Sequence, residues 1–281
     1  MPTASDRSRL ISIVQSRQNA RVRELRAAFS RSGREVSEVI AIEGENLLAE
    51  ALRSGLRLRT VFIRTEPDRP NLRVLERLTL PALVPIVSLN PAVFASAVET
   101  ESPQGIAALV EPPQFSLVDA LAGPRPLVLI AAGLQDPGNF GTLIRSAEAF
   151  GASGVIALPG TVCVWNPKAL RASAGSAFRV PVVQEKSAAA FAALAERRIP
   201  VLAAAAPAEE LETIPCSDFD LTGPAAILIG NEGSGLSQEL LDRASARIAI
   251  PMPGPVESLN AAVAASILLY EAARQHAARQ S

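Results

Sequence analysis

The chain has 281 residues, of which 48% are apolar and 20% are charged, a balance that excludes a wholly disordered chain and fits one large domain or two smaller ones. Its two cysteines, Cys163 and Cys216, and its single histidine, His276, are too few and too scattered for a disulfide framework or a zinc site. The net charge of −1 does not by itself indicate a polyanionic partner.

Membrane and secretory segments are not expected. No apolar run reaches the roughly 18 residues that span a bilayer, and Arg7 and Arg9 are not followed by the long apolar stretch of a secretory signal. We therefore expect a cytoplasmic protein.

Positive charge gathers at the N-terminus, where residues 1–34 contain eight arginines and only two acidic residues. Within residues 17–31, Val22, Leu25 and Phe29 recur at spacings of three and four, which predicts an amphipathic helix with a basic outer face. Such a face suits a phosphate backbone. A merely solvated basic helix has the same pattern, so both interpretations stay open.

Short strands and helices alternate over the first half of the chain. After the basic helix, the patterns predict strands at 39–42, 60–63, 84–87 and 105–110, and helices at 45–53, 72–78 and 91–98. This order predicts a small α/β unit. Prolines and glycines then gather in residues 111–126, so we expect a linker at 113–126 between a domain over 1–112 and a second domain over 127–281.

The second half repeats the alternation with more strongly apolar strands. Strands are predicted at 127–134, 155–158, 201–204, 225–229 and 248–251, and helices ending near Gly151, over 188–197 and 238–244, and from 261 onward. Apolar runs of this length are typical of buried parallel strands. Helices between parallel strands predict an α/β fold with a doubly wound parallel sheet.

Ligands of open α/β sheets bind beyond the carboxyl ends of the strands, and the first loop to consider there is Asp136–Gly141. Asn139 lies in this loop, and Arg145 follows in the first turns of the next helix. Another interpretation is that Arg145 only pairs with Glu148 while Asn139 only caps the helix.

Two further loops follow predicted strands. Gly230–Leu236 is rich in glycine but has neither the GxGxxG order nor a Walker lysine, so alone it indicates nucleotide binding only weakly. Pro251–Asn260 has too many prolines for a helix or strand, and it favours a fixed irregular path that suits a ligand wall. A plain helix entry capped by Glu257 or Ser258 accounts for the same residues.

Taken together and in this order, the segments Asn139–Arg145, Leu228–Gly235, Ile250–Gly254 and Ser258–Asn260 closely resemble the three motifs of the SpoU (TrmH-like) RNA ribose 2'-O-methyltransferases. The resemblance covers residues 127–275. The N-terminal segment, with Glu43–Gly44 at a helix start and Gln104–Gly105 at a strand start, is similar to the ribosomal-L30e-like substrate-binding domain of that family.

The resemblance implies a SPOUT fold whose C-terminal segment threads a deep trefoil knot, an exception to the rule that native chains avoid knots. It also implies S-adenosylmethionine as cofactor and a homodimer that builds the site at its interface. The positions that match the family's cofactor-binding residues are Gly230, Ile250, Met252, Ser258 and Leu259. Val263, Ile267 and Tyr270 form a stripe that suits either the dimer surface or ordinary packing on the sheet.

The catalytic positions implied by the resemblance are Arg145, Asn139, Glu232 and Asn260. Because a guanidinium keeps its proton in proteins, we expect Arg145 to bind an RNA phosphate and stabilise the forming alkoxide, not to act as a general base. Asn139 would orient Arg145 or the ribose, Glu232 would position a loop or a partner-chain arginine, and Asn260 would hold the third loop.

The implied partner is ribosomal or transfer RNA. Aromatic residues make up only 4% of the chain, so arginine contacts to phosphate are expected to dominate over base stacking. The candidates are Arg21, Arg23, Arg26 and Arg34. A non-catalytic RNA-binding protein with the same fold is the alternative function, whereas a nicotinamide-dependent oxidoreductase lacks its glycine fingerprint.

Overall fold

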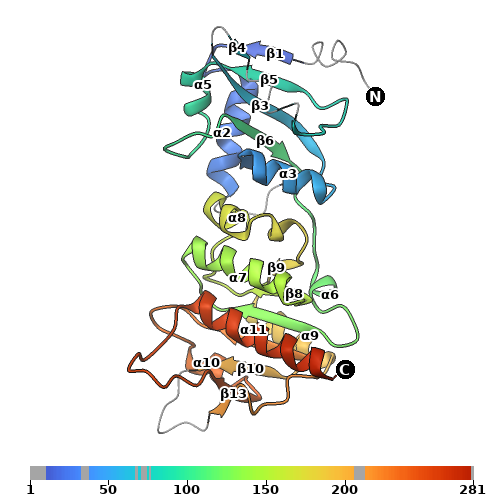
Figure 1. Cartoon of the computed structure of the whole chain (residues 1–281), viewed down its shortest axis with the longest axis vertical. Helices are drawn as coiled ribbons and strands as arrows, with labels where there is room; N and C mark the ends of the chain where they lie inside the picture. The colour runs from blue at the N-terminus through green and yellow to red at the C-terminus, as the bar shows by residue number, and fades with distance from the viewer. Residues whose placement is uncertain are drawn as a thin grey trace. The chain divides into compact units, whose positions relative to one another are not determined.

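The computed structural model describes residues 11–32, 38–66, 69–70, 75, 77–205 and 213–279. Arg34 and most of the predicted helix over 72–78 lie outside the described residues. Two compact units make up the chain (Figure 1). The first comprises Met1–Pro113 with Trp165–Phe178, and the second comprises Gln114–Val164 with Arg179–Ser281.

The first unit is built on a mixed sheet. Its strands are β1 (Ile11–Val14), β2 (Ile40–Glu43), β3 (Leu58–Glu66), β4 (Arg69–Pro70), β5 (Ile86–Leu89) and β6 (Ile106–Val110). They lie in the order β1-β5-β3-β6-β2, with β4 paired to β3. β1, β5 and β3 run parallel, whereas β6 is antiparallel to β3 and β2. β5 begins two residues later than predicted, after Pro85, which has no N–H to donate.

The helices of the first unit are α2 (Ala20–Ser32), α3 (Glu45–Arg53), α5 (Pro91–Ala95) and α8 (Pro167–Ser173). The predicted apolar stripe of α2 is confirmed, because Val22, Leu25 and Phe29 are buried against the sheet together with α5. Each such side chain contributes about 1.5–3 kcal/mol to the stability of the fold. α3 and α8 both contact β2.

The second unit is built on a fully parallel sheet, which confirms the predicted class of fold. Its strands are β7 (Leu127–Ala131), β8 (Gly154–Ala157), β9 (Val182–Gln184), β10 (Val201–Ala204), β11 (Ile214–Pro215), β12 (Ala225–Ile229) and β13 (Ala246–Ala249). Their order is β11-β13-β10-β12-β7-β8-β9, and every pairing is parallel. β13 ends at Ala249, two residues before the predicted end at Pro251.

Helices cover both faces of this sheet. They are α6 (Leu117–Ala120), α7 (Pro137–Ala149), α9 (Ser187–Glu196), α10 (Gln238–Leu241) and α11 (Ala261–Ala278). Phe191 and Leu194 of α9 pack with Val128 and Leu228 of the central strands. On the other side, α11 packs on α7 and β12 (Figure 1). The central strands are buried on both faces, which is why they read as continuous apolar runs.

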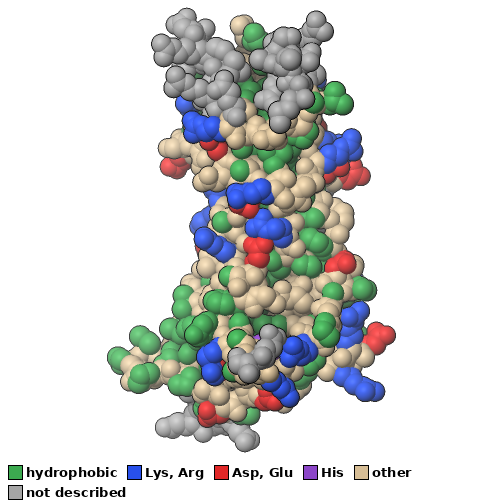
Figure 2. All heavy atoms as spheres, turned by 45° about the vertical axis from the view of Figure 1, so that its right-hand side comes forward, with side chains coloured by type: hydrophobic (Ala, Val, Ile, Leu, Met, Phe, Trp, Pro, Cys, Tyr) green, Lys and Arg blue, Asp and Glu red, His purple; other side chains and the backbone are tan. Residues whose placement is uncertain are grey.

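Charge is spread over the surface. On the face drawn in Figure 2, basic and acidic side chains are interspersed over the described surface. Among the described residues, none of the helices is long and apolar enough to cross a membrane.

Candidate active site

The centre of the parallel sheet brings two of the three predicted loops together. β7 and β12 are neighbours, paired from Leu127 with Ala225 to Ala131 with Ile229, so the loops that leave their carboxyl ends lie beside each other. The third loop follows β13 and leads into α11, which packs on α7 and β12. The site therefore lies at the edge of the sheet where ligands of such folds bind.

Asp136, and not Asn139, caps the helix that follows the first loop. The Asp136 side chain accepts a hydrogen bond from the Asn139 backbone N–H at 2.7 Å, and Pro137 occupies the first helical position. The alternative in which Asn139 serves as the cap is therefore wrong. The Asn139 side chain is left to make other contacts.

Those contacts join the three loops. Asn139 Nδ2 donates to Glu232 Oε1 at 2.8 Å, and Asn260 Nδ2 donates to Asn139 Oδ1 at 3.0 Å. Asn260 Oδ1 in turn accepts the backbone N–H groups of Ala262 and Val263. Because Asn260 Oδ1 faces those donors, the Asn260 amide nitrogen must face Asn139 Oδ1. The Asn139 amide nitrogen must then face the Glu232 carboxylate, so the hydrogen bonds fix the orientation of both amides. Asn260 rather than Ser258 or Glu257 caps α11.

Arg145 is exposed on α7 and has no hydrogen bond or ion pair within the part of the chain that the structure describes. The carboxylate predicted as its partner is occupied, because Arg179 Nη2 donates to Glu148 Oε2 at 3.0 Å and Arg179 Nε also contacts that carboxylate. The alternative pairing of Arg145 with Glu148 is therefore wrong. The Arg145 guanidinium faces solvent and is available to an anion.

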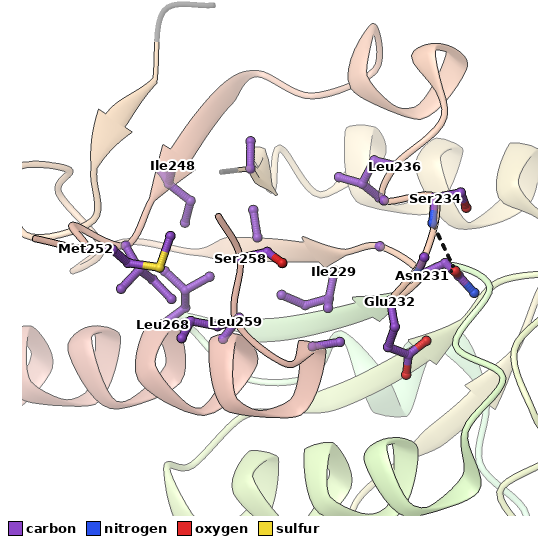
Figure 3. A pocket seen from close by; sticks show the side chains of 18 residues that line it. Ile229, Asn231, Glu232, Ser234, Leu236, Ile248, Met252, Ser258, Leu259 and Leu268 are labelled. Carbon is purple, nitrogen blue, oxygen red and sulfur yellow. Dashed lines mark hydrogen bonds between the residues drawn. The ribbon is translucent and has the colours of Figure 1, made fainter. Parts of the chain in front are cut away.

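A cavity of about 390 Å³ lies next to these side chains. Its walls come from the loop after β12, the loop after β13 and the start of α11, and all five predicted cofactor positions line it: Gly230, Ile250, Met252, Ser258 and Leu259. Figure 3 shows apolar side chains, Ile248, Met252 and Leu268, at one end, and polar ones, Asn231, Glu232 and Ser234, at the other. The arrangement suits an elongated ligand with one apolar and one polar part.

The loop after β12 folds tightly upon itself. Asn231 and Gly235 exchange two backbone hydrogen bonds, of 3.1 and 2.9 Å. A Cβ on Gly230 would lie 2.5 Å from the Gly235 carbonyl carbon, so only glycine leaves room for this fold. Asn231 Oδ1 accepts the N–H groups of Gly233 and Ser234. Sequence reasoning missed Asn231, although an asparagine opening a glycine-rich turn is a known turn signal.

His276 and Cys216, two other side chains that could take part in chemistry, do not line the cavity. His276 Nε2 lies 2.9 Å from the Leu221 carbonyl oxygen, so it is the donor there. Burial, and secondly the Glu271 carboxylate, raise the pKa of the Cys216 thiol, which leaves little thiolate at neutral pH. Among the described residues, no three His, Cys, Asp or Glu side chains form a group that could hold a metal ion.

Three of the four arginines proposed for RNA contact, Arg21, Arg23 and Arg26, lie on α2 of the first unit. Arg21 and Arg23 are exposed. Arg26 is partly buried, and its guanidinium donates to the Ser96 carbonyl oxygen at 2.8 Å and to Ser96 Oγ at 3.2 Å. These bonds to Ser96, the residue that caps the end of α5, distinguish Arg26 from the other two.

Comparison with known proteins places this site in a family. The profile described as the SpoU rRNA Methylase family matches residues 126–270, and that described as an MRM3-like substrate binding domain matches residues 19–108. The chain belongs to the SpoU rRNA methylase family.

Relatives of this SpoU family member match it over most of its length. The 23S rRNA (guanosine(2553)-2'-O)-methyltransferase RlmP of Bacillus subtilis is 34% identical over 92% of this chain and 97% of its own. Mouse mitochondrial rRNA methyltransferase 3 is 32% identical over 88% of this chain and 70% of its own. Among solved structures, the AdoMet complex of the SpoU methyltransferase AviRb from Streptomyces viridochromogenes is 30% identical, with a TM-score of 0.79 over 92% of this chain and 99% of that chain.

Proposed function

We propose that this protein transfers the methyl group of S-adenosylmethionine to a ribose 2'-hydroxyl of RNA. The observation that carries the proposal is the convergence of Asn139 from the first turn of α7, Glu232 from the loop after β12 and Asn260 from the start of α11, beside a cavity in a chain of the SpoU family. RlmP, a relative similar over nearly the whole chain, is named for methylation of a 2'-oxygen of 23S rRNA. Ribosomal RNA is therefore the first substrate class to test.

The cavity fits S-adenosylmethionine in size and chemistry. Its volume of about 390 Å³ lies within the usual range for small-molecule sites, roughly 300–1,000 Å³. Ile250, Met252 and Leu259 would hold the apolar faces of the adenosine, and the irregular backbone around Gly230 would supply hydrogen-bonding groups. When bound, the sulfonium supplies an activated methyl group.

Arg145 would act on the acceptor side. Its guanidinium is exposed and lacks a partner among the described residues, so its positive charge is available to an anion. It would bind an RNA phosphate and stabilise the 2'-oxygen as that oxygen loses its proton, because a fixed positive charge lowers the energy of a developing anion. The proton would pass to that phosphate or to water.

The three joined side chains would position the acceptor. Asn139 has both amide atoms engaged, by Glu232 and by Asn260, so it would act as a rigid spacer between the loops. Glu232 would hold the second loop, or a partner-chain arginine, in place, and Asn260 would tie the start of α11 to the same point. Rigid alignment matters because in-line transfer depends on near-attack geometry.

The first unit would bind the RNA. The match of residues 19–108 to a substrate binding domain supports an L30e-like role for residues 1–112, followed by a linker over 113–126 and the methyltransferase domain over 127–281. Exposed Arg21 and Arg23 on α2 are the described candidates for phosphate contacts. The proposed compartment is the cytoplasm.

The dimer and the knot complete the proposal. Of the stripe on α11, Val263 and Tyr270 are 47% and 55% exposed and Ile267 is half-buried, and the two exposed side chains suit a second copy of the chain. The trefoil knot is part of the same proposal and rests on membership of the SpoU family; after β13 the chain lines the same cavity as the loop after β12 and continues into α11, which packs on α7. Light scattering on the purified protein measures the dimer directly.

The test compares Arg145→Ala with wild type in methyl incorporation from labelled S-adenosylmethionine into ribosomal RNA lacking its 2'-O-methyl groups. We expect a loss of about 10²- to 10³-fold in kcat, the usual cost of removing one charge-stabilising donor, with cofactor affinity retained. Arg243→Ala, which removes an arginine that packs on Phe191, is the control and should stay active. A fully active Arg145→Ala would refute the role of this side chain, and an inactive wild type that binds RNA would favour the non-catalytic alternative.

A further inference from the structure

The cofactor loop after β12 is fastened to the loop after β7 by one side chain. Asn231 Nδ2 donates to the Gly133 carbonyl oxygen at 2.7 Å, while its Oδ1 accepts the N–H groups of Gly233 and Ser234 at 2.8 and 3.2 Å. One amide thus determines both the shape of the loop and its attachment. The position of Glu232, the next residue, depends on the same attachment.

Gly133 is itself fixed by a residue outside all three motif segments. The Gly133 N–H donates to Thr161 Oγ1 at 3.0 Å, and Thr161 Oγ1 donates to the Ala131 carbonyl oxygen at 2.9 Å. Thr161 lies in the loop after β8, and a Cβ on Gly160 beside it would be in ordinary van der Waals contact with the Gly133 Cα, at 3.5 Å. The Val162 N–H also donates to the Leu134 carbonyl oxygen at 2.8 Å.

We propose that Thr161 is a positioning residue for the cofactor site. Its hydroxyl holds the Gly133 N–H, and the Gly133 carbonyl, on the other side of the same Cα, holds Asn231 and, through it, the loop that lines the cavity. Thr161 does not line the cavity itself, so it acts only through this hydrogen-bonded chain. The inference deepens the proposed function and rests on it.

The arrangement explains why a threonine is needed at this position. The hydroxyl accepts one hydrogen bond and donates another, which is the pairing that a single Oγ offers. A valine has the same shape but leaves the partly buried Gly133 N–H without its acceptor, and an unpaired donor in such a place is costly. A serine keeps the hydroxyl and removes only a methyl group.

The test measures S-adenosylmethionine binding by calorimetry and steady-state methyl transfer for Thr161→Val and Thr161→Ser. We expect Thr161→Val to raise the Kd and the KM for S-adenosylmethionine by about tenfold, with kcat at saturating cofactor within about twofold of wild type. Thr161→Ser should restore affinity to near the wild-type value. The matched control is Thr65→Val, because the Thr65 hydroxyl likewise makes two hydrogen bonds, one with Ser88 Oγ and one to the Leu89 carbonyl oxygen, in the first unit.

Each outcome decides one question. If wild type binds S-adenosylmethionine and Thr161→Val binds it equally well, the positioning role is wrong. If Thr161→Val and Thr65→Val lower the melting temperature alike and neither changes the Kd, the hydroxyl serves only stability and the inference also fails. If wild type itself does not bind S-adenosylmethionine, the proposed function fails instead.

Discussion

Replacing Gly230 with alanine should weaken S-adenosylmethionine binding without unfolding the protein. The added Cβ would lie 2.5 Å from the Gly235 carbonyl carbon, 2.7 Å from its oxygen and 2.8 Å from the Leu236 nitrogen. All three are backbone atoms, so no side-chain rotation relieves the overlap. To make room, the Asn231–Gly235 loop would have to move away from the end of β12.

The overlap has an energetic cost of known scale. Forcing one extra methyl group into a packed site usually costs about 1–3 kcal/mol. Because the displaced loop forms a wall of the cavity, we expect about 2 kcal/mol of this in cofactor affinity, which corresponds to a Kd about 30-fold higher. Isothermal calorimetry at a temperature well below unfolding measures it.

Two other glycines in the second unit serve as controls. A Cβ on Gly254, in the loop after β13, meets nothing within 4 Å, so Gly254→Ala should bind as wild type does. A Cβ on Gly154 would lie 2.5 Å from the Ala120 Cα, a clash of equal size away from the cavity, and Gly154→Ala should lower the melting temperature while the folded protein keeps its affinity. A folded Gly230→Ala with a Kd within twofold of wild type would refute the reasoning.

Two further predictions concern charge. Replacing both Arg21 and Arg23 with alanine should weaken RNA binding at low salt. It should also reduce the slope of log affinity against log salt concentration by about 0.7–0.9 for each phosphate that is no longer neutralised. The control Arg53→Ala, which removes an arginine paired with Glu50, should leave that slope unchanged, and an unchanged slope in the double variant would exclude α2 from the RNA surface. Hydrogen bonds from Arg274 chiefly lower the pKa of Glu271, so this carboxylate stabilises the fold above its unfolded pKa of about 4.3 and the stabilisation disappears as pH falls through the lower folded pKa. In urea titrations Glu271→Gln should therefore lower the free energy of unfolding by up to about 1 kcal/mol at pH 7, and should not change it at an acidic pH where the wild-type carboxylate is protonated. An equal loss at pH 7 and at the acidic pH would contradict the ion-pair origin.

Much of the secondary structure followed from local patterns. The apolar runs of β7 and β12 and the stripe of α2 are signals carried by neighbouring residues, and each predicted the observed element within a few residues. β9 and α8 were missed for different reasons. β9 has only three residues, too few for a period to show. α8 begins with Asn166 as cap and Pro167 at the first position, a start signal that could have revealed it.

The site divides in the same way. The motif segments could be identified along the chain, but their hydrogen bonds could not. The Asn139 side chain bonds Glu232, which lies 93 positions further along the chain, and Asn260, which lies 121 positions further along. No local pattern reports that distance. The same holds for Glu148, which by spacing should pair with Arg145 but is taken by Arg179, 31 residues further on.

By itself, then, the order of side chains determined which segments would be buried, which would turn and which chemistry they could carry, because these properties depend on hydrophobicity and backbone preference over a few residues. Only the tertiary structure decided that Asp136 caps α7, that Arg145 stands unpaired among the described residues, and that Thr161 supports the cofactor loop. The physical reason is that hydrogen bonds and ion pairs act over a few ångströms, and the pairing of strands, not the proximity of residues in the chain, sets those distances.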